Sequence, residues 1–196
     1  MYKIILASGS PRRREILEQA GIKFEIKASN AEEITDKTNP ADMVEELALL
    51  KAEAVRKEEE GEFLIISADT LVFLDGKPLG KPKNGGEAYE MLDCLSGRKH
   101  EVYTGVAIII REKGKAEKQL VFHQMSRVEV EDLSREQIEA YIATGEPFDK
   151  AGAYAIQGKF AVHISRIEGE YNNIVGLPIA KIYHELLKEG VDLLKN

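Results

Sequence analysis

The sequence predicts a mixed α/β fold in which a twisted sheet is flanked by helices. Short apolar runs typical of buried strands alternate with segments of helical periodicity through most of the chain. Two long runs rich in Val and Ile lie within residues 101–130, and Lys113-Gly114-Lys115 between them predicts a hairpin. The 196 residues contain no internal repeat, low-complexity segment or linker. We therefore expect at most a single domain, over residues 1–196, with a pronounced cleft.

The first elements are expected to be a strand, a helix and a second strand. Tyr2–Ala7 is mostly apolar and predicts a buried strand. Ser10 suits the N-cap of the following helix, Pro11 its first position and Gly21 its end. Lys23–Ala28 alternates apolar and charged residues, which predicts a second strand.

A long helix opens at Asn39-Pro40, where the Asn suits the N-cap and the Pro the first turn. Its predicted apolar stripe consists of Met43, Leu47, Leu50 and Ala54. Further along the chain, strands are predicted at Phe63–Ser67, Thr70–Leu74 and Ala161–Ile167, and helices at Gly86–Leu95, Ser134–Gly145 and Pro178–Lys188.

The composition narrows the class of protein. Lys and Arg number 27 against 34 Asp and Glu, and this net charge of −7 argues against a binder of nucleic acid or of an anionic membrane. The single cysteine, Cys94, excludes an internal disulfide and a cysteine-rich zinc site. No apolar run is long enough to span a bilayer, and the N-terminus is unlike a signal peptide. We expect a cytoplasmic protein.

Three arginines, Arg12, Arg13 and Arg14, occupy the first turn of the first predicted helix. Cations belong near the C-terminal end of a helix, because the N-terminus carries a partial positive charge and unpaired N–H groups. A bound polyphosphate explains the placement, since guanidinium groups pair with phosphate oxygens. Ser8, in the loop before the helix, belongs to the same candidate site. A solvated basic helix start with an ordinary Ser-Pro cap remains the alternative.

Asp69 follows an apolar strand, at a position where the active sites of α/β folds commonly lie. Its carboxylate could activate a water molecule, hold a divalent cation, or do both. A turn aspartate with local hydrogen bonds is the alternative. Glu32 or Glu33 would supply a second acidic group for Mg²⁺, and Lys51 and Lys81 could hold phosphates as point charges. Solvated surface charges are the alternative for each of these residues.

Small residues and glycines surround one amide side chain in Asp149–Gly158. This composition suits the close approach of a backbone to a flat ligand. Gln157 could read the edge of a nucleobase, because an amide presents both a donor and an acceptor. A glycine-rich loop packed against a strand is the alternative. Tyr171–Pro178 is expected to be a second loop that leads into the last helix.

Five blocks of the sequence resemble the Maf family of nucleotide pyrophosphatases, also called septum-formation proteins. In chain order these blocks are Ile5–Arg13, Ser67–Thr70, Gly80–Pro82, His100–Gly105 and Tyr171–Pro178. They extend from the first predicted strand to the start of the last helix, and five blocks in order are more specific than any one. The resemblance implies an elongated α/β domain with a central cleft between two lobes, similar to inosine triphosphate pyrophosphatases, and a homodimer.

The resemblance also implies an activity, the hydrolysis of a nucleoside triphosphate to the monophosphate and pyrophosphate with Mg²⁺ or Mn²⁺. It places the general base at Asp69 and an acidic partner at Glu33, with the metal held near both. The family's triphosphate-binding groups fall on Arg12, Arg13, Lys51 and Lys81. We expect alanine at either arginine to weaken substrate binding and to leave the helix as stable or slightly more stable.

The block Ile156-Gln157-Gly158 resembles the subfamily that acts on dTTP and UTP, in which Arg12, Thr70 and Gln157 would shape specificity. The predicted function is therefore that of a dTTP/UTP pyrophosphatase that cleans the nucleotide pool, with modified pyrimidine triphosphates as further candidate substrates. A non-enzymatic, nucleotide-binding regulator of cell division is an alternative. A phosphatase that removes only the terminal phosphate is a third reading.

Overall fold

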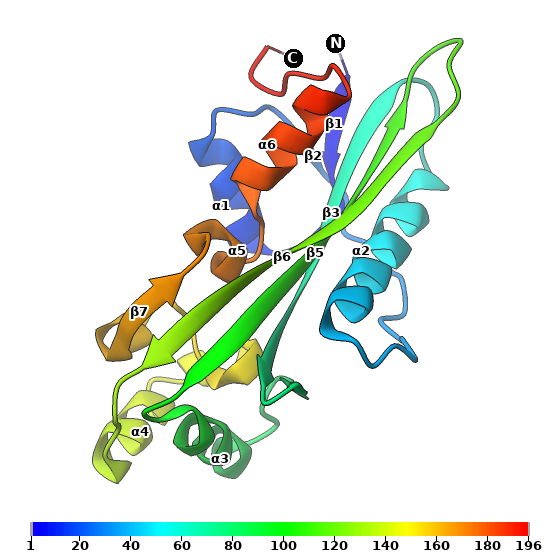
Figure 1. Ribbon diagram of the computed structural model, residues 1–196. Helices are drawn as coiled ribbons and strands as arrows, with labels where there is room; N and C mark the ends of the chain where they lie inside the picture. The colour runs from blue at the N-terminus through cyan, green and yellow to red at the C-terminus, as the bar shows by residue number, and fades with distance from the viewer. Residues whose placement is uncertain (1, 196) are drawn as a thin grey trace. The chain divides into compact units, whose positions relative to one another are not determined.

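A computed structural model describes residues 2–195, so both end residues of the predicted 1–196 domain lie outside the described residues. Its strands form one seven-stranded sheet in the order β2-β1-β3-β5-β6-β7, with β4 paired to β3 (Figure 1). The strands are β1 Lys3–Leu6, β2 Glu25–Ile26, β3 Phe63–Leu74, β4 Lys77–Leu79, β5 Lys99–Arg111, β6 Lys118–Val130 and β7 Ile164–Glu168. The α-helices are α1 Pro11–Gln19, α2 Pro40–Arg56, α3 Gly85–Leu95, α4 Arg135–Ile142, α5 Tyr171–Val175 and α6 Ile179–Lys188. Three short 3₁₀ helices are η1 Glu146–Asp149, η2 Ala151–Ala153 and η3 Lys159–His163.

The first part of the chain forms the parallel part of the sheet. β1 runs parallel to both β2 and β3, and Ile5 faces Glu25 on one side and Ile65 on the other. Parallel neighbours need crossover connections, which α1 and α2 provide. Because β4 and β7 pair in the antiparallel direction, the sheet is mixed. The predicted mixed α/β fold with flanking helices is therefore confirmed.

α2 covers one face of β1 and β3, whereas α1 and α6 lie on the other side (Figure 1). The core under α2 consists of Ile5, Ala7, Ala48, Ala52, Val55, Phe63, Ile65, Ala107 and Ile109. The predicted stripe of α2 was wrong except for Leu47. The buried residues of this helix are Val44, Leu47, Ala48, Ala52 and Val55. Two of these residues are alanines, whose small side chains let the helix approach the sheet closely.

β3 is one continuous strand where the sequence predicted two. Asp69, for which a turn was the alternative, remains extended within the sheet. Ser67 donates from Oγ to the backbone oxygen of Ala48 at 2.6 Å, so its buried hydroxyl is satisfied by α2. Asp69 consequently lies inside β3 and not at its end.

Other predicted segments also differ from the structure. Of the second predicted strand, Glu25–Ile26 forms the edge strand β2 of the sheet, and Ile26 is 47% exposed. The last strand begins at Ile164, since the residues before it form the helix η3. Tyr171–Val175, predicted as a loop, is the short helix α5. The predicted capping box of Ser134 with Gln137 is present at the start of α4.

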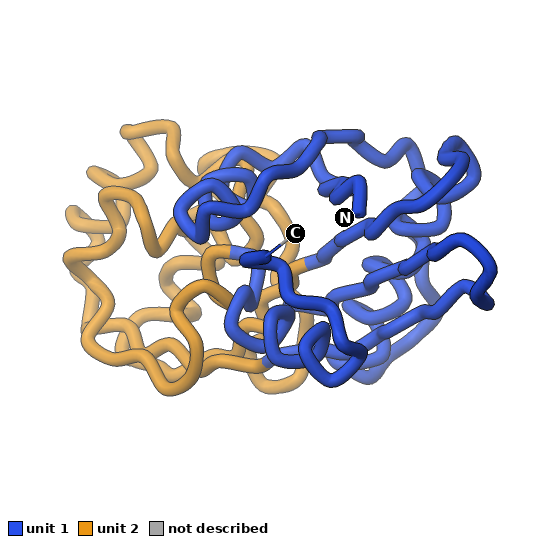
Figure 2. The backbone as a smooth tube through the Cα atoms, turned by 90° about the horizontal axis from the view of Figure 1, so that it is seen from above, with its two compact units in different colours: residues 1–69, 104–124, 176–196 blue, residues 70–103, 125–175 orange. Residues whose placement is uncertain are grey.

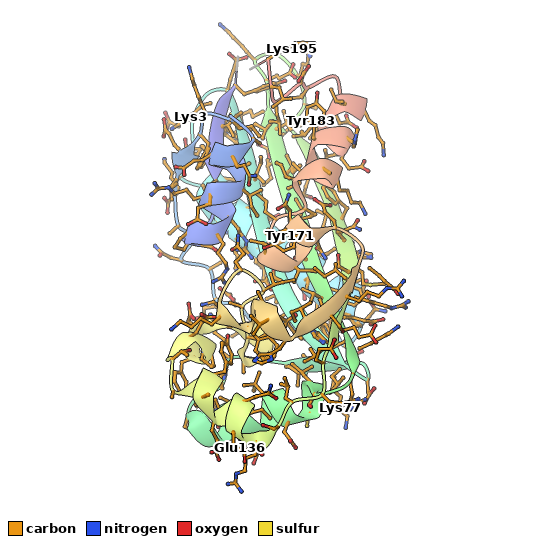
Figure 3. All side chains as sticks on the ribbon, turned by 90° about the vertical axis from the view of Figure 1, so that its left-hand side faces the viewer. Lys3, Lys77, Glu136, Tyr171, Tyr183 and Lys195 are labelled. Atoms are coloured by element: carbon orange, nitrogen blue, oxygen red, sulfur yellow. The ribbon has the colours of Figure 1, made fainter. Side chains whose placement is uncertain are left out.

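The chain divides into two compact units, shown in different colours in Figure 2. The first comprises residues 1–69, 104–124 and 176–196, and includes β1, β2, α1, α2 and α6. The second comprises residues 70–103 and 125–175, and includes α3, α4 and α5. Figure 3 labels Lys3 and Tyr183 in the first unit, and Glu136 and Tyr171 in the second. Among residues 2–195, no helix is long and apolar enough to cross a membrane.

Candidate functional site

The first unit brings three predicted site residues into direct contact. The ammonium group of Lys51 lies 2.5 Å from Oδ1 of Asp69 and 3.0 Å from Oε1 of Glu33. The side chains of Lys51 and Asp69 are 12% and 8% exposed, whereas that of Glu33 is 59% exposed. The site therefore pairs a buried carboxylate with a buried cation, and a second carboxylate approaches from the solvent side.

The local structure explains why Lys51 reaches Asp69. Lys51 falls on the sheet-facing stripe of α2, four residues after Leu47 and four before Val55. A charged residue on such a stripe is stable only when it is paired. Asp69, on the buried strand β3, provides that partner.

Close packing of α2 against β5 sets the position of this helix. At Gly105 of β5, a Cβ atom would lie 2.0 Å from the backbone oxygen of Val44, so only glycine fits here. Gly105 fell within one of the resembling blocks, but sequence reasoning did not identify its role. An isolated glycine within a strand pattern was the signal that could have found it, because such a glycine marks a close backbone approach.

The loop before α1 and the first turn of that helix form a second group in the same unit. Ser10 occupies the N-cap, as predicted, but its side chain makes no capping hydrogen bond. Its backbone N–H instead donates to Oγ of Ser8 at 3.2 Å. The same oxygen accepts a hydrogen bond from the guanidinium of Arg13 at 3.0 Å, and Arg13 also donates from Nε to the backbone oxygen of Gly176 at 2.8 Å.

Arg12 and Arg13 differ in their environments. Burial lowers the pKa of Arg13, and the positive charge of Arg12 lowers it further. The negative charges of Asp69 and Glu33 oppose this shift. An arginine remains charged under such shifts. The side chain of Arg12 makes no hydrogen bond or ion pair with any other residue in the described range 2–195. The first turn of α1 contains no acidic residue, so the cationic charge of Arg12 is uncompensated there.

The remaining predicted site residues, Thr70, Lys81 and Gln157, belong to the second unit. Thr70 follows Asp69 along β3. Lys81 and Gln157 are exposed. A hydrogen bond links the segments that carry them: the N–H of Gly152 donates to the backbone oxygen of Gly80 at 3.0 Å.

The acidic residues of the first unit suit a divalent cation to a limited extent. Within residues 2–195, no group of three or more His, Cys, Asp or Glu side chains is arranged to hold a metal ion. Asp69 and Glu33 do converge on one ammonium group, so both carboxylates can meet at a common cation. Mg²⁺ is commonly held by one or two carboxylates together with substrate phosphates. The donor set therefore fits a cation that arrives with a polyphosphate.

Comparisons with known proteins find relatives that match the full length of the chain. The chain is 53% identical to a dTTP/UTP pyrophosphatase of Lachnoclostridium phytofermentans over 195 residues, which is 100% of this chain and 99% of that protein. It is 48% identical to a dTTP/UTP pyrophosphatase of Bacillus thuringiensis, with 98% of each chain covered.

Two solved structures share the fold at low sequence identity. The Ham1 protein of Staphylococcus aureus superposes with a TM-score of 0.50 at 17% identity, covering 95% of this chain and 99% of that one. A HAM1 protein from Coxiella burnetii gives a TM-score of 0.51 at 18% identity, covering 96% of this chain and 100% of that one.

Residues 3–189 match the family described as Maf-like protein. The chain thus belongs to the Maf family.

Proposed function

We propose that this protein hydrolyses dTTP and UTP to the nucleoside monophosphate and pyrophosphate. One observation carries the proposal: the carboxylate of Asp69, whose side chain is 8% exposed, is held by a buried lysine in the unit that also contains the arginine-bearing start of α1. The names of the full-length relatives, dTTP/UTP pyrophosphatases at 53% and 48% identity, support the same activity.

The start of α1 would bind the triphosphate. Its backbone N–H groups and the arginine side chains supply donors and positive charge, which anionic oxygens require. Arg12 is available for a phosphate because no residue in the range 2–195 pairs with it. Arg13, which is tied to Ser8 and Gly176, would present a fixed guanidinium with its remaining donors. Lys51 and Lys81 would add positive charge as phosphate ligands.

Asp69 would accept a proton from the attacking water. The water oxygen forms a bond to the α-phosphorus, the bond from that phosphorus to the α–β bridging oxygen breaks, and pyrophosphate leaves with the bridging oxygen. Lys51 orients the Asp69 carboxylate through its 2.5 Å contact. Asp69 and Glu33 would hold the divalent cation, Mg²⁺ or Mn²⁺, which when bound neutralises phosphate charge. Positioning and charge neutralisation account for most of the rate in reactions of this class.

Gln157 would read the base, with Thr70 and Arg12 contributing to specificity. Uracil and thymine present a carbonyl, an N–H and a second carbonyl along the pairing edge, and an amide can satisfy an adjacent donor and acceptor there. Cytosine replaces one carbonyl with an amine and lacks the ring N–H, so the same amide would face mismatched groups. A site that pairs with substrate hydrogen-bonding groups can reject unmatched analogues by up to about 10⁴–10⁵-fold.

Three further properties belong to the proposal. They are a single functional domain, a homodimer and a cytoplasmic housecleaning role. The family resemblance supports all three, and the family match over residues 3–189 also supports the single domain. Modified pyrimidine triphosphates are the wider substrate class, since an amide that reads the pairing edge is indifferent to substituents on the opposite edge.

The test is a comparison of kcat/KM for dTTP, UTP, CTP and ATP with Mg²⁺ and then Mn²⁺, with product identification. We expect dTTP and UTP to be cleaved much faster than CTP and ATP, with pyrophosphate as product. Gln157→Ala should reduce the difference in kcat/KM between these two groups of substrates. Orthophosphate with a diphosphate would indicate a terminal phosphatase, and binding without turnover would indicate a nucleotide sensor. A purine triphosphate as best substrate would refute Gln157 as a pyrimidine reader.

A further inference from the structure

The loop that carries Gln157 is anchored at both ends by buried aromatic side chains. Tyr154 and Phe160 flank the loop 155–159, are 5% and 0% exposed, and contact each other with ring centroids 5.1 Å apart. Tyr141 of α4 packs on Phe160 at 4.9 Å between centroids. Gln157 itself is exposed and makes no hydrogen bond to any other residue in the range 2–195. The loop is thus fixed at both ends, and the side-chain amide of Gln157 between them is exposed and makes no hydrogen bond within residues 2–195.

Two side chains close a hydrogen-bonded clamp on this loop. The hydroxyl oxygen of Tyr141 accepts a hydrogen bond from the N–H of Ala155 at 3.2 Å and donates to Oε1 of Glu146 at 2.9 Å. The other carboxylate oxygen of Glu146 accepts from the N–H of Lys159 at 3.1 Å. The Tyr141–Glu146 clamp therefore holds the backbone two residues before Gln157 and two residues after it.

The clamp also explains a glycine next to Gln157. A Cβ atom at Gly158 would lie 1.9 Å from Oε1 and 2.6 Å from Oε2 of Glu146. The backbone of Gly158 has φ −103° and ψ −158°, which other residues adopt, so a side chain here would conflict with the Glu146 carboxylate and not with the backbone conformation. The Glu146 carboxylate is therefore packed directly against the loop.

The hydrogen-bond directions in the clamp are fixed by chemistry. Burial and the hydrogen bond to Glu146 raise the pKa of Tyr141, so its hydroxyl remains protonated and donates to the carboxylate. An ionised carboxylate can only accept, which matches the Tyr141 hydroxyl and the Lys159 N–H on its two oxygens. Hydrogen bonds to a charged group are stronger than neutral ones, so this arrangement suits a rigid loop.

We propose that Tyr141 and Glu146 are positioning residues for base selection, and that they act by holding the loop 155–159 so that Gln157 meets the pairing edge of the pyrimidine. The proposal rests on the role of Gln157 in the proposed function. A side chain that reads a base discriminates only when its supporting shell holds it in place, and a misplacement of about 1 Å can cost about 100-fold. In this proposal the clamp residues act through the loop and not by contact with the substrate.

The experiment measures the ratio of kcat/KM for dTTP to that for CTP in the full-length protein. We expect Glu146→Gln and Tyr141→Phe each to lower this ratio by about 5-fold to 100-fold, mainly through the KM for dTTP. Gly158→Ala, which displaces the Glu146 carboxylate without removing it, should act in the same direction. The matched control is Glu139→Gln on α4, an exposed glutamate paired with Arg135 at 2.8 Å, which should leave the ratio unchanged.

A double variant separates positioning from general stability. In the Gln157→Ala background, Glu146→Gln should cause no further loss of selectivity, because the group that it positions is gone. An equal loss in both backgrounds, or an equal fall in kcat/KM for dTTP and CTP together with a lower Tm, would show a purely structural role and overturn the proposal. Should Glu146→Gln fail to fold, Tyr141→Phe and Gly158→Ala carry the same test.

The experiment distinguishes an error in the role of Gln157 from an error in the role of the clamp. If Gln157→Ala leaves the dTTP-to-CTP ratio unchanged, Gln157 does not select the base and the clamp has no base-selecting side chain to position. If Gln157→Ala lowers the ratio while all three clamp variants preserve it, the assignment of Gln157 to base selection is retained and the clamp proposal is overturned.

Discussion

The ammonium group of Lys51 lies 2.5 Å from the carboxylate of Asp69, and both side chains are almost fully buried. Burying either charge alone would be costly, so each requires the other for the fold to tolerate it. The same pairing orients the Asp69 carboxylate and places positive charge beside it. Stability and proposed chemistry therefore depend on the same contact.

Asp69→Asn should reduce kcat by at least about 100-fold, because the amide keeps the size of the side chain but cannot accept a proton as a base. The variant should be less stable than the wild type but still folded, since Glu33 remains as an anionic partner of Lys51. Steady-state kinetics with dTTP and circular dichroism measure the two effects. Asp75→Asn is the matched control, since Asp75 is an exposed turn residue paired with Arg98. Near-normal turnover in Asp69→Asn would remove Asp69 from the mechanism.

Alanine at Arg12 and at Arg13 should give different outcomes, contrary to the equal effect expected from the sequence. Arg12→Ala should raise the KM for dTTP by about 10-fold to 100-fold, the effect of one lost charge-assisted hydrogen bond, with stability changed by less than about 0.5 kcal/mol. Arg13→Ala should also lower the free energy of unfolding by about 1–3 kcal/mol, because Ser8 and Gly176 lose a partner. Denaturant unfolding and kinetics of both variants check this. Equal stability of the two variants would contradict the assigned contacts.

Gly105→Ala should destabilise the protein by about 2 kcal/mol or more and lower kcat as well. The added methyl group would meet the backbone of Val44 at 2.0 Å, and the shift of α2 needed to relieve this would carry Lys51 away from Asp69. Gly85→Ala, at the start of α3, is the control, since its Cβ would meet only Ile142 at an ordinary 3.8 Å. If Gly105→Ala matched the wild type in both measurements, the close approach of α2 would not govern the site.

His100 should make stability depend on pH in the acidic range. Burial lowers its pKa to about 4 from 6.5, so between these values the unfolded chain binds a proton that the folded protein does not. Stability from this group is present above pH 6.5 and is lost as the pH falls toward 4, by up to about 3 kcal/mol. The free energy of unfolding of His100→Gln should therefore fall less steeply over this window than that of the wild type. Parallel curves for the two proteins would contradict the shift.

Much of the fold could be predicted because the local signals were strong. The capping box of Ser134 with Gln137 and the Gly-containing hairpin between β5 and β6 are fixed by neighbouring residues, and both predictions were confirmed. The buried face of α2 was predicted with the wrong residues, because two stripes fit the helical spacing. Contacts with β1, β3 and β5 select the one that contains Ala48 and Ala52.

The contacts among the candidate site residues could not be predicted from the sequence. The sequence indicated Asp69 and Lys51 separately. The alternative for Asp69 was a structural turn residue, and that for Lys51 was a solvated surface charge. Their pairing depends on the extended path of β3 through a segment that reads as a turn, which long-range sheet pairing determines. The Tyr141–Glu146 clamp depends in the same way on tertiary contacts, although Gly158 gave a local hint.

The most direct test of the central claim is hydrolysis of dTTP in water enriched in ¹⁸O, with Mg²⁺ and mass spectrometry of both products. Attack on the α-phosphorus places the water oxygen in the monophosphate, so we expect labelled dTMP and unlabelled pyrophosphate. Both products should become at least about 100-fold slower to form in Asp69→Asn. Label in the pyrophosphate, or dTDP with orthophosphate as products, would contradict the claim.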